Sequence, residues 1–165
     1  MGAVAAKDLK LKDKNVAYEF EGIFGPGENI YVDSSGYPEL VIVDSSHPIS
    51  SLYYLAIIID GNVYMDFDYS DFWHAELNYI TQEAILEVDF EFTFNLPGNP
   101  TIIGHSDAMI SNYGTPDRTL QGTLTLVGTG LFDEVKGYAE DEGWDVEGGW
   151  YIHHVGVIKN WPGLP

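Results

Sequence analysis

The sequence predicts an all-β fold, a single antiparallel β-barrel of about eight strands with a short N-terminal arm. Short segments of alternating apolar and polar residues recur along the 165 residues, and turns rich in glycine, proline or asparagine separate them. No segment has the pattern of a crossover helix, which parallel strands would require. The pattern therefore favours antiparallel pairing, and a β-sandwich is the alternative arrangement.

The chain divides into an N-terminal arm, residues 1–14, and one barrel domain, residues 15–165. The arm has a helix-like composition, but its alternating Lys and Asp residues indicate a solvated segment rather than a packed helix. No internal repeat or low-complexity linker divides the rest of the chain. A hydrophobic content of 45%, with 14% aromatic residues, is enough to fill one core.

The first half of the barrel domain contains short predicted strands separated by turn residues. They are Val16–Glu21, Asn29–Val32, Leu40–Val43, Ser51–Ile59 and Val63–Phe67. Gly25–Gly27 breaks the chain after the first strand. Asp60–Asn62 predicts a tight hairpin turn, because glycine and asparagine tolerate the positive φ that such turns need.

The second half contains the clearest strand, Glu87–Phe94. Its even-numbered residues are Val or Phe and its odd-numbered residues are Glu, Asp or Thr, so one face is expected to be buried and the other wet. Leu120–Leu126 repeats this pattern. Tyr151–Val157 is the predicted closing strand, and an acidic connection is expected before it.

Charge and composition exclude several classes of partner and chemistry. Asp and Glu number 26 against 7 Lys and Arg, and the net charge of -19 repels nucleic acid and anionic membranes. The chain has no Cys, which excludes disulfides, thiolate nucleophiles and Cys-based zinc sites. No run approaches the roughly 18 apolar residues of a membrane span. We expect a cytoplasmic protein, or one whose leader has already been removed.

The C-terminal part carries glycine and aromatic residues in a distinctive order. A Gly-x-Gly-x-Phe segment is followed by a glycine, an aromatic closing strand, Gly-x-Ile-Lys and a proline. These residues are Gly128, Gly130, Phe132, Gly137, Tyr151, Gly156, Ile158, Lys159 and Pro162. The order resembles the last part of the allene oxide cyclases and, more loosely, of the dirigent proteins. Tyr18-Glu19-Phe20-Glu21 is similar to a Tyr-Glu-Ile-Asn segment on the first strand of the cyclases.

The resemblance implies an eight-stranded, calycin-like barrel with an apolar interior. It implies a hydrophobic small-molecule substrate, no cofactor or metal, and a homo-oligomer, a dimer or trimer, as a further possibility. The family's first-strand Glu is associated with its chemistry, so that role falls on Glu19, whereas Glu21 stands where the family has Asn. Residues 22–110 contain no alignable motif, so the substrate's identity is not transferred.

Glu19 and Glu21 share one face of the first strand. If Tyr18 and Phe20 pack outward, both carboxylates face the barrel interior, where desolvation would suit one of them to general acid–base catalysis. If Tyr18 and Phe20 pack inward, both carboxylates face water. The residue pattern leaves both arrangements open.

Histidines supply the other catalytic candidates. His105 and Asp107 share a face and suit a proton-handling pair, with a hydrogen-bonded strand-end histidine as the alternative. Ser106 points the other way, so the contiguous residues form no hydrolase triad. His153 is the next candidate. It is adjacent to His154, and the two side chains face opposite sides of the strand, so they cannot easily hold one ion. A structural role is the alternative for both.

Two further groups of residues have candidate roles. Asp66, Asp68 and Asp71 superficially resemble a calcium loop, but the central Gly and distal Glu of an EF-hand are missing, so no metal site is predicted. Aromatic side chains are expected to line a pocket or its mouth, with core packing as the alternative. The predicted ligand-binding residues are Tyr18, Glu21, Phe90, Phe92, Trp73 and Tyr151.

Together these observations favour a cofactor-free cyclase or isomerase that acts on a hydrophobic intermediate of natural-product biosynthesis, of polyketide, terpenoid or oxylipin-like type. Pocket shape would select one substrate conformer, and one carboxylate or histidine would assist. A dirigent-like or lipocalin-like binder without chemistry is the first alternative, and a carbohydrate-binding module the second. A closed apolar cavity containing converging polar residues would favour the enzyme, whereas an open groove lined by Trp73, Trp144 and Trp150 would favour the sugar binder.

Overall fold

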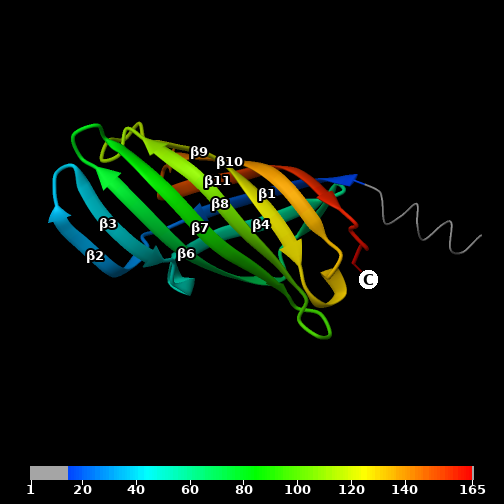
Figure 1. Cartoon of the computed structure of the whole chain (residues 1–165). Coiled ribbons are helices and arrows are strands. Elements are labelled where there is room, and N and C mark those ends of the chain that lie inside the picture. The colour runs from blue at the N-terminus through cyan, green and yellow to red at the C-terminus, as the bar shows by residue number, and fades with distance from the viewer. Residues whose placement is uncertain (1–14, 165) are drawn as a thin grey trace, which may run out of the picture.

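A computed structural model describes residues 15–164, which form one antiparallel β-sheet curled into a half-barrel (Figure 1). The predicted arm, residues 1–14, lies outside the described residues. The strand order is β2-β3-β6-β7-β8-β9-β10-β11-β1-β4-β5. The elements are β1 (Asn15–Phe24), β2 (Glu28–Gly36), β3 (Leu40–Ser46), the 3-10 turn η1 (Ile49–Ser51), β4 (Leu52–Ile59), β5 (Asn62–Tyr64), β6 (Phe67–Asn78), β7 (Glu83–Phe94), β8 (Thr101–Ser111), β9 (Thr119–Gly128), the 3-10 turn η2 (Gly130–Phe132), β10 (Lys136–Val146) and β11 (Gly149–Lys159).

The all-β antiparallel fold is confirmed, but the number of strands and the closure of the barrel differ from the prediction. The sheet has eleven strands rather than about eight, and its two edge strands, β2 and β5, do not pair with each other. The predicted acidic connection before the closing strand is wrong, because it forms strand β10. Its acidic residues Glu140 and Glu142 lie at outer positions, while Ala139 and Gly143 face inward. The segment is therefore a regular strand, although its many acidic residues suggested a loop.

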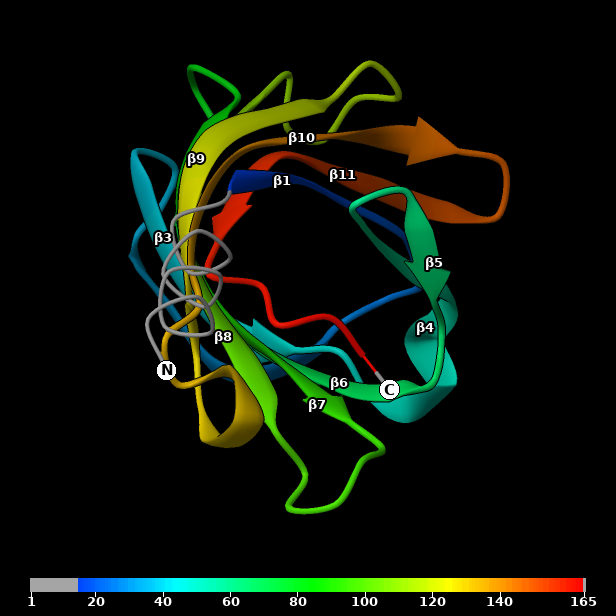
Figure 2. The same ribbon diagram turned by 90° about the vertical axis from the view of Figure 1, so that its right-hand side faces the viewer.

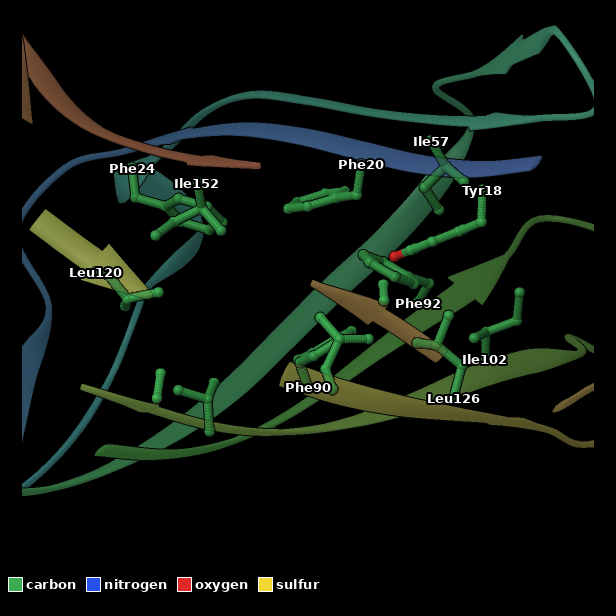
Figure 3. Close-up of a cluster of buried hydrophobic side chains, with 14 of the residues drawn as sticks. Tyr18, Phe20, Phe24, Ile57, Phe90, Phe92, Ile102, Leu120, Leu126 and Ile152 are labelled. Atoms are coloured by element: carbon green, nitrogen blue, oxygen red, sulfur yellow. The ribbon is translucent and has the colours of Figure 1, made fainter. Parts of the chain in front are cut away.

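The interior is filled by rows of aromatic and branched side chains (Figure 3). In β7 the predicted alternation is confirmed: the Val and Phe side chains from Val88 to Phe94 are buried, Glu87 and Asp89 are exposed, and Glu91 is half-buried. Phe90 lies opposite Gly104 in the β7–β8 pair. A Cβ atom at position 104 would lie 2.0 Å from the Phe90 ring, so the glycine makes room for this ring.

Turn residues confirm the predicted hairpin between β4 and β5. Asp60 and Gly61 have φ angles of 53° and 78°, which match the twist of two antiparallel strands. Gly130, with φ of 61°, opens the short turn η2. Gly128 lies against Phe132, whose carbonyl oxygen would be 1.9 Å from an added Cβ. These two glycines therefore form the corner at which the chain leaves β9.

One end of the half-barrel is closed by aromatic side chains. Phe132 is fully buried, and its ring stacks on Trp161 with a centroid distance of 4.9 Å. Trp161 and Leu164 belong to the segment after β11, and both pack against the core. Figure 2 shows this C-terminal segment crossing the end of the half-barrel. A pocket can therefore open only toward the opposite end or through the side.

Replacing Phe92 by Ala should lower the free energy of unfolding by about 3 to 5 kcal/mol, because a fully buried aromatic ring is lost and a cavity remains. Phe72→Ala on the neighbouring strand β6 is the matched control. Phe72 is 41% exposed on the outer face, so its loss should cost less than about 1 kcal/mol. Urea denaturation followed by tryptophan fluorescence measures both values. Equal losses would contradict the assigned orientation of the β6–β7 pair.

Candidate functional site

A pocket of about 260 Å³ lies at the end of the half-barrel opposite Phe132. Its floor is apolar, with side chains from β3, β6, β7 and β8, and polar side chains join it from the loops. The lining residues are Gly25, Pro26, Gly27, Asn29, Val43, Ser45, His47, Trp73, Ala75, Leu77, Leu86, Ile110, Tyr113, Arg118 and Trp150. The volume is near the lower end of the range of about 300 to 1,000 Å³ typical of small-molecule sites.

The carboxylate of Asp71 is the most heavily hydrogen-bonded side chain beside this pocket. Its side chain has no exposed surface. Oδ2 accepts hydrogen bonds from Tyr69 Oη at 3.0 Å and Trp73 Nε1 at 2.7 Å, and it lies 2.7 Å from His47 Nδ1. Oδ1 accepts a hydrogen bond from the His47 backbone N–H at 2.8 Å. Four donors thus compensate the burial of one negative charge.

The local sequence places His47 where its ring can reach both Asp71 and the pocket. Strand β3 ends at Ser46, and Pro48 directs the chain into η1, so His47 lies at the corner between them. Its ring packs against Phe24 at 4.9 Å and Trp73 at 5.4 Å between centroids. Nδ1 contacts Asp71, while Nε2 has no hydrogen-bond partner among the described residues. A carboxylate at Nδ1 favours the tautomer with its proton there, which leaves a lone pair on Nε2.

Arg118 supplies a cationic side chain at the pocket wall. Its Nε and Nη2 atoms donate to Asp145 at 2.8 to 3.0 Å, and its guanidinium lies 4.3 Å above the centre of the Trp150 ring. This is the only arginine in the sequence. The ion pair and the ring contact hold the guanidinium in place and cover one face of Trp150.

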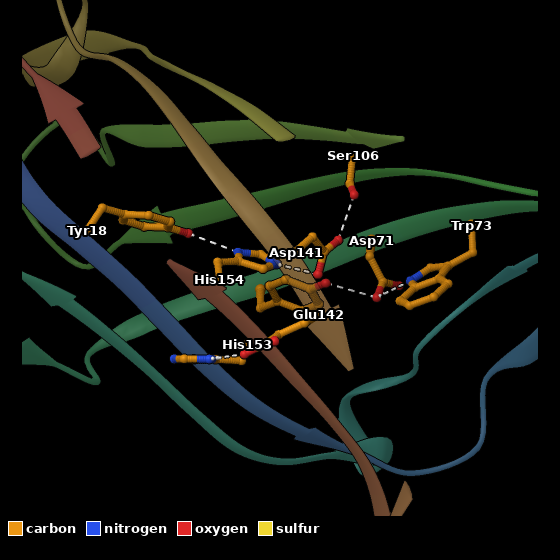
Figure 4. Close-up of polar contacts among 9 residues, drawn as sticks. Tyr18, Asp71, Trp73, Ser106, Asp141, Glu142, His153 and His154 are labelled. Carbon is orange, nitrogen blue, oxygen red and sulfur yellow. Dashed lines mark hydrogen bonds and ion pairs between the residues drawn. The ribbon is translucent and has the colours of Figure 1, made fainter. Parts of the chain in front are cut away.

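A second buried polar group lies deeper in the core (Figure 4). Tyr18 Oη is 3.1 Å from His154 Nδ1, and Ser106 Oγ donates to Asp141 Oδ2 at 2.6 Å. His154 Nε2 lies 3.6 Å from Asp141 Oδ1. Burial lowers the pKa of His154 to about 3, with a smaller effect from His153, and burial raises the pKa of Asp141 to about 6 against the opposing Ser106 hydrogen bond. None of these four side chains lines the pocket at the open end.

Glu19 and Glu21 do not face the interior. Tyr18 and Phe20 are each 1% exposed and fill the core, so the alternation of β1 directs both glutamates to the outer face. The inward arrangement considered from the sequence is therefore wrong. Glu19 nevertheless contacts another of the catalytic candidates, because its Oε1 atom lies 2.6 Å from His153 Nε2.

The other predicted catalytic residues also lie on the outer face. His105 and Asp107 are exposed, and their closest approach is 3.5 Å, whereas His105 Nδ1 lies 2.7 Å from Asp89. Ser106 is buried on the opposite face, as predicted. His153 lies between Glu19 and Glu142. Glu19, His105 and His153 thus do not converge in one cavity.

The predicted ligand-binding residues separate into three groups. Tyr18, Phe90 and Phe92 are core residues and do not line the pocket. Glu21 and Tyr151 lie on the outer face. Trp73 alone lines the pocket at the open end.

The Asp66, Asp68 and Asp71 cluster does not form a calcium site. Asp66 and Asp68 are exposed, while the side chain of Asp71 is turned inward and bonded to His47, Tyr69 and Trp73. The three carboxylates are therefore not directed at one point.

Sequence reasoning did not select His47 or Arg118, and it considered Asp71 only as a calcium ligand. One usable signal was present in β6. Tyr69, Asp71 and Trp73 occupy alternate positions and so share a face, which places one acidic residue among aromatic side chains that turn inward. His47 carries no such signal, because its partner lies 24 residues away.

Comparisons of the chain with protein-family models, curated proteins and solved structures find no match. The resemblance to the allene oxide cyclases therefore stays a prediction. Within residues 15–164 there is also no helix with the length and apolar character needed to cross a membrane.

Two histidines of the outer face predict how stability varies with pH. Hydrogen bonds that His74 and His105 donate to Asp44 and Asp89 raise the pKa of each histidine above 6.5. A raised pKa in the folded state means that their contribution is present below pH 6.5 and lost as pH rises through the folded pKa. The melting temperature should therefore rise modestly as pH falls from about 9 to about 6.5. A double variant, His74→Gln with His105→Gln, should show a flatter profile, and an unchanged profile would contradict the prediction.

Proposed function

We propose that the pocket at the open end binds a hydrophobic small molecule and promotes a cofactor-free proton transfer that isomerises or cyclises it. His47 is the acid–base residue, and Asp71 positions it. The observation that carries the proposal is the Asp71–His47 contact beside an apolar pocket. Glu19, His105, Asp107 and His153, the candidates drawn from the sequence, have no part in this chemistry because they lie on the outer face.

The chemistry follows from the tautomer of His47. With the proton on Nδ1 directed at Asp71, Nε2 can accept a proton from a bound molecule, and the resulting imidazolium is stabilised by the adjacent carboxylate. Asp71 has little tendency to reorient, since Tyr69 and Trp73 hold the same oxygen atom. A fixed base in a confined pocket gains from orientation as well as from proton transfer.

The pocket walls favour an apolar, partly oxygenated substrate. Val43, Leu77, Leu86 and Ile110 form a hydrocarbon surface, while the guanidinium of Arg118 is available to an oxygen atom that gains negative charge. This agrees with the substrate class implied by the resemblance to the allene oxide cyclases, although the sheet is a half-barrel rather than a closed barrel. It differs in the catalytic group, because the role carried over to Glu19 passes to His47.

The non-catalytic binder shares the same pocket and becomes the preferred function if proton transfer fails. The carbohydrate-binding alternative is less favoured, because sugar binding needs tryptophan rings with a free face in an open groove. Arg118 covers one face of Trp150, and the Trp73 N–H donates to Asp71. Trp144 packs against Tyr151 and does not line the pocket.

The proposal can be tested with 5-nitrobenzisoxazole, a small planar aromatic molecule. In its base-catalysed elimination, His47 Nε2 takes the proton bound to carbon, the electron pair of that bond forms a nitrile, and the N–O bond breaks to release a coloured phenolate. The wild-type protein should accelerate this reaction. His47→Gln should lower the rate about 10² to 10⁴-fold, the usual contribution of general acid–base catalysis.

His105→Gln is the matched control, because His105 also pairs with an aspartate but lies on the outer face. Its elimination rate should equal that of the wild type. Asp71→Asn should lower the rate while leaving binding of the probe unchanged, since Asp71 acts through His47. Equal rates in the wild type and His47→Gln would overturn the proton-transfer proposal and leave a binding protein.

A further inference from the structure

Four polar side chains form a cluster on the outer face of the half-barrel, away from the pocket. The outer cluster consists of Glu19 and Glu21 from β1, Glu142 from β10 and His153 from β11. The three strands are neighbours in the sheet, and His153 lies directly opposite both Glu21 and Glu142 in the strand register. Residues from both ends of the sequence thus meet at one imidazole.

The cluster presents one nitrogen and two carboxylate oxygens to a common point. One ligand atom from each of Glu19, Glu21 and His153 lies within 4.8 Å of the others. His153 Nε2 is 2.6 Å from Glu19, while Nδ1 is 2.9 Å from Glu142. A carboxylate at Nδ1 is the usual partner of a metal-binding histidine, because it fixes the ring and directs the other nitrogen at the ion.

The surroundings distinguish this cluster from scattered surface charge. The side chain of His153 is only 17% exposed, and Tyr151 stacks on it at 5.9 Å between centroids, while Trp144 packs against Tyr151 in a tilted arrangement. Three carboxylates surround the one imidazole. In the part of the chain that the structure describes, Glu19 and Glu142 each have His153 as their only ion-pair partner. Negative charge is therefore in excess within the outer cluster.

We propose that the outer cluster binds a divalent transition-metal ion, with His153 Nε2, Glu19 and Glu21 as ligands and Glu142 as the positioning residue. Zinc–ligand distances of roughly 2.0 to 2.2 Å separate neighbouring ligand atoms by about 3 to 3.5 Å. The Glu19–His153 contact must therefore lengthen by less than about 1 Å, which a flexible glutamate allows. A mixed nitrogen and oxygen donor set favours zinc over calcium or magnesium.

This site is the opposite of the sequence expectation that no metal is bound. That expectation rested on the absence of Cys and of histidines at chelating spacing, whereas here a single histidine is completed by two residues 134 and 132 positions away. A second group, Glu87, His105 and Asp107, has comparable separations, but all three residues are exposed. It serves as an internal control for non-specific attraction of cations to an acidic surface.

The test is calorimetric titration of the full chain with Zn²⁺, with Ca²⁺ for comparison. One Zn²⁺ ion should bind with an affinity at least about 10-fold tighter than Ca²⁺. Glu21→Gln should weaken Zn²⁺ binding at least about 10-fold, and Glu142→Gln about 10 to 100-fold. Neither variant removes a core residue, and circular dichroism checks that both fold.

His105→Gln is the matched control and should leave the Zn²⁺ affinity unchanged. Loss of binding in Glu21→Gln and Glu142→Gln alone would support the site. Zn²⁺ binding no tighter than Ca²⁺ binding, or an equal loss in His105→Gln, would overturn the proposal in favour of general attraction to the acidic surface. Because the pocket variant His47→Gln is not involved, this outcome is independent of the proton-transfer proposal.

Discussion

The carboxylate of Asp71 holds the start of the connection from β3 to β4, which crosses between the two sides of the half-barrel that do not pair. The strand order ends at β2 on one side and β5 on the other, so hydrogen bonds between strands never close the barrel. Near this opening, Asp71 on β6 binds the backbone and ring of His47, in the connection from β3 to β4. One buried charge thus fixes the corner of the chain that forms the pocket wall, and it also orients the imidazole there.

Histidine side chains lie beside carboxylates throughout the described part of this acidic chain. All five histidines of the sequence lie within 4 Å of a carboxylate, at Asp71, Asp44, Asp89, Glu142 and Asp141 among others. Four of these five carboxylates lie on a strand that pairs with the strand of their histidine, and the fifth, Asp71, contacts His47 just after the end of β3. In a chain with 7 basic residues against 26 acidic ones, the raised pKa values of His74 and His105 favour their charged forms, which offset part of the repulsion between neighbouring strands.

In β7 the sequence was sufficient to predict where side chains point, but it was insufficient to predict which side chains of different strands meet. The alternation of Glu87–Phe94 determines the buried face of β7 without reference to any other strand. The same alternation in β1 was ambiguous, because either the face with Tyr18 and Phe20 or the face with Glu19 could have been the one turned to the interior. Contacts such as His47 with Asp71, or Glu19 with His153, depend on the order of strands in the sheet, and no short-range pattern encodes that order.

The aromatic stack of Phe132 and Trp161 limits the route that a ligand can take into and out of the half-barrel. Because it fills the end opposite the pocket, a molecule at the pocket cannot pass along the axis of the barrel and leave at the far side. A ligand of the proposed kind therefore enters and leaves through the same opening, and a second ligand can bind only after the first has dissociated. Residence time, rather than the rate of encounter, then sets the upper limit on how often the pocket can be used.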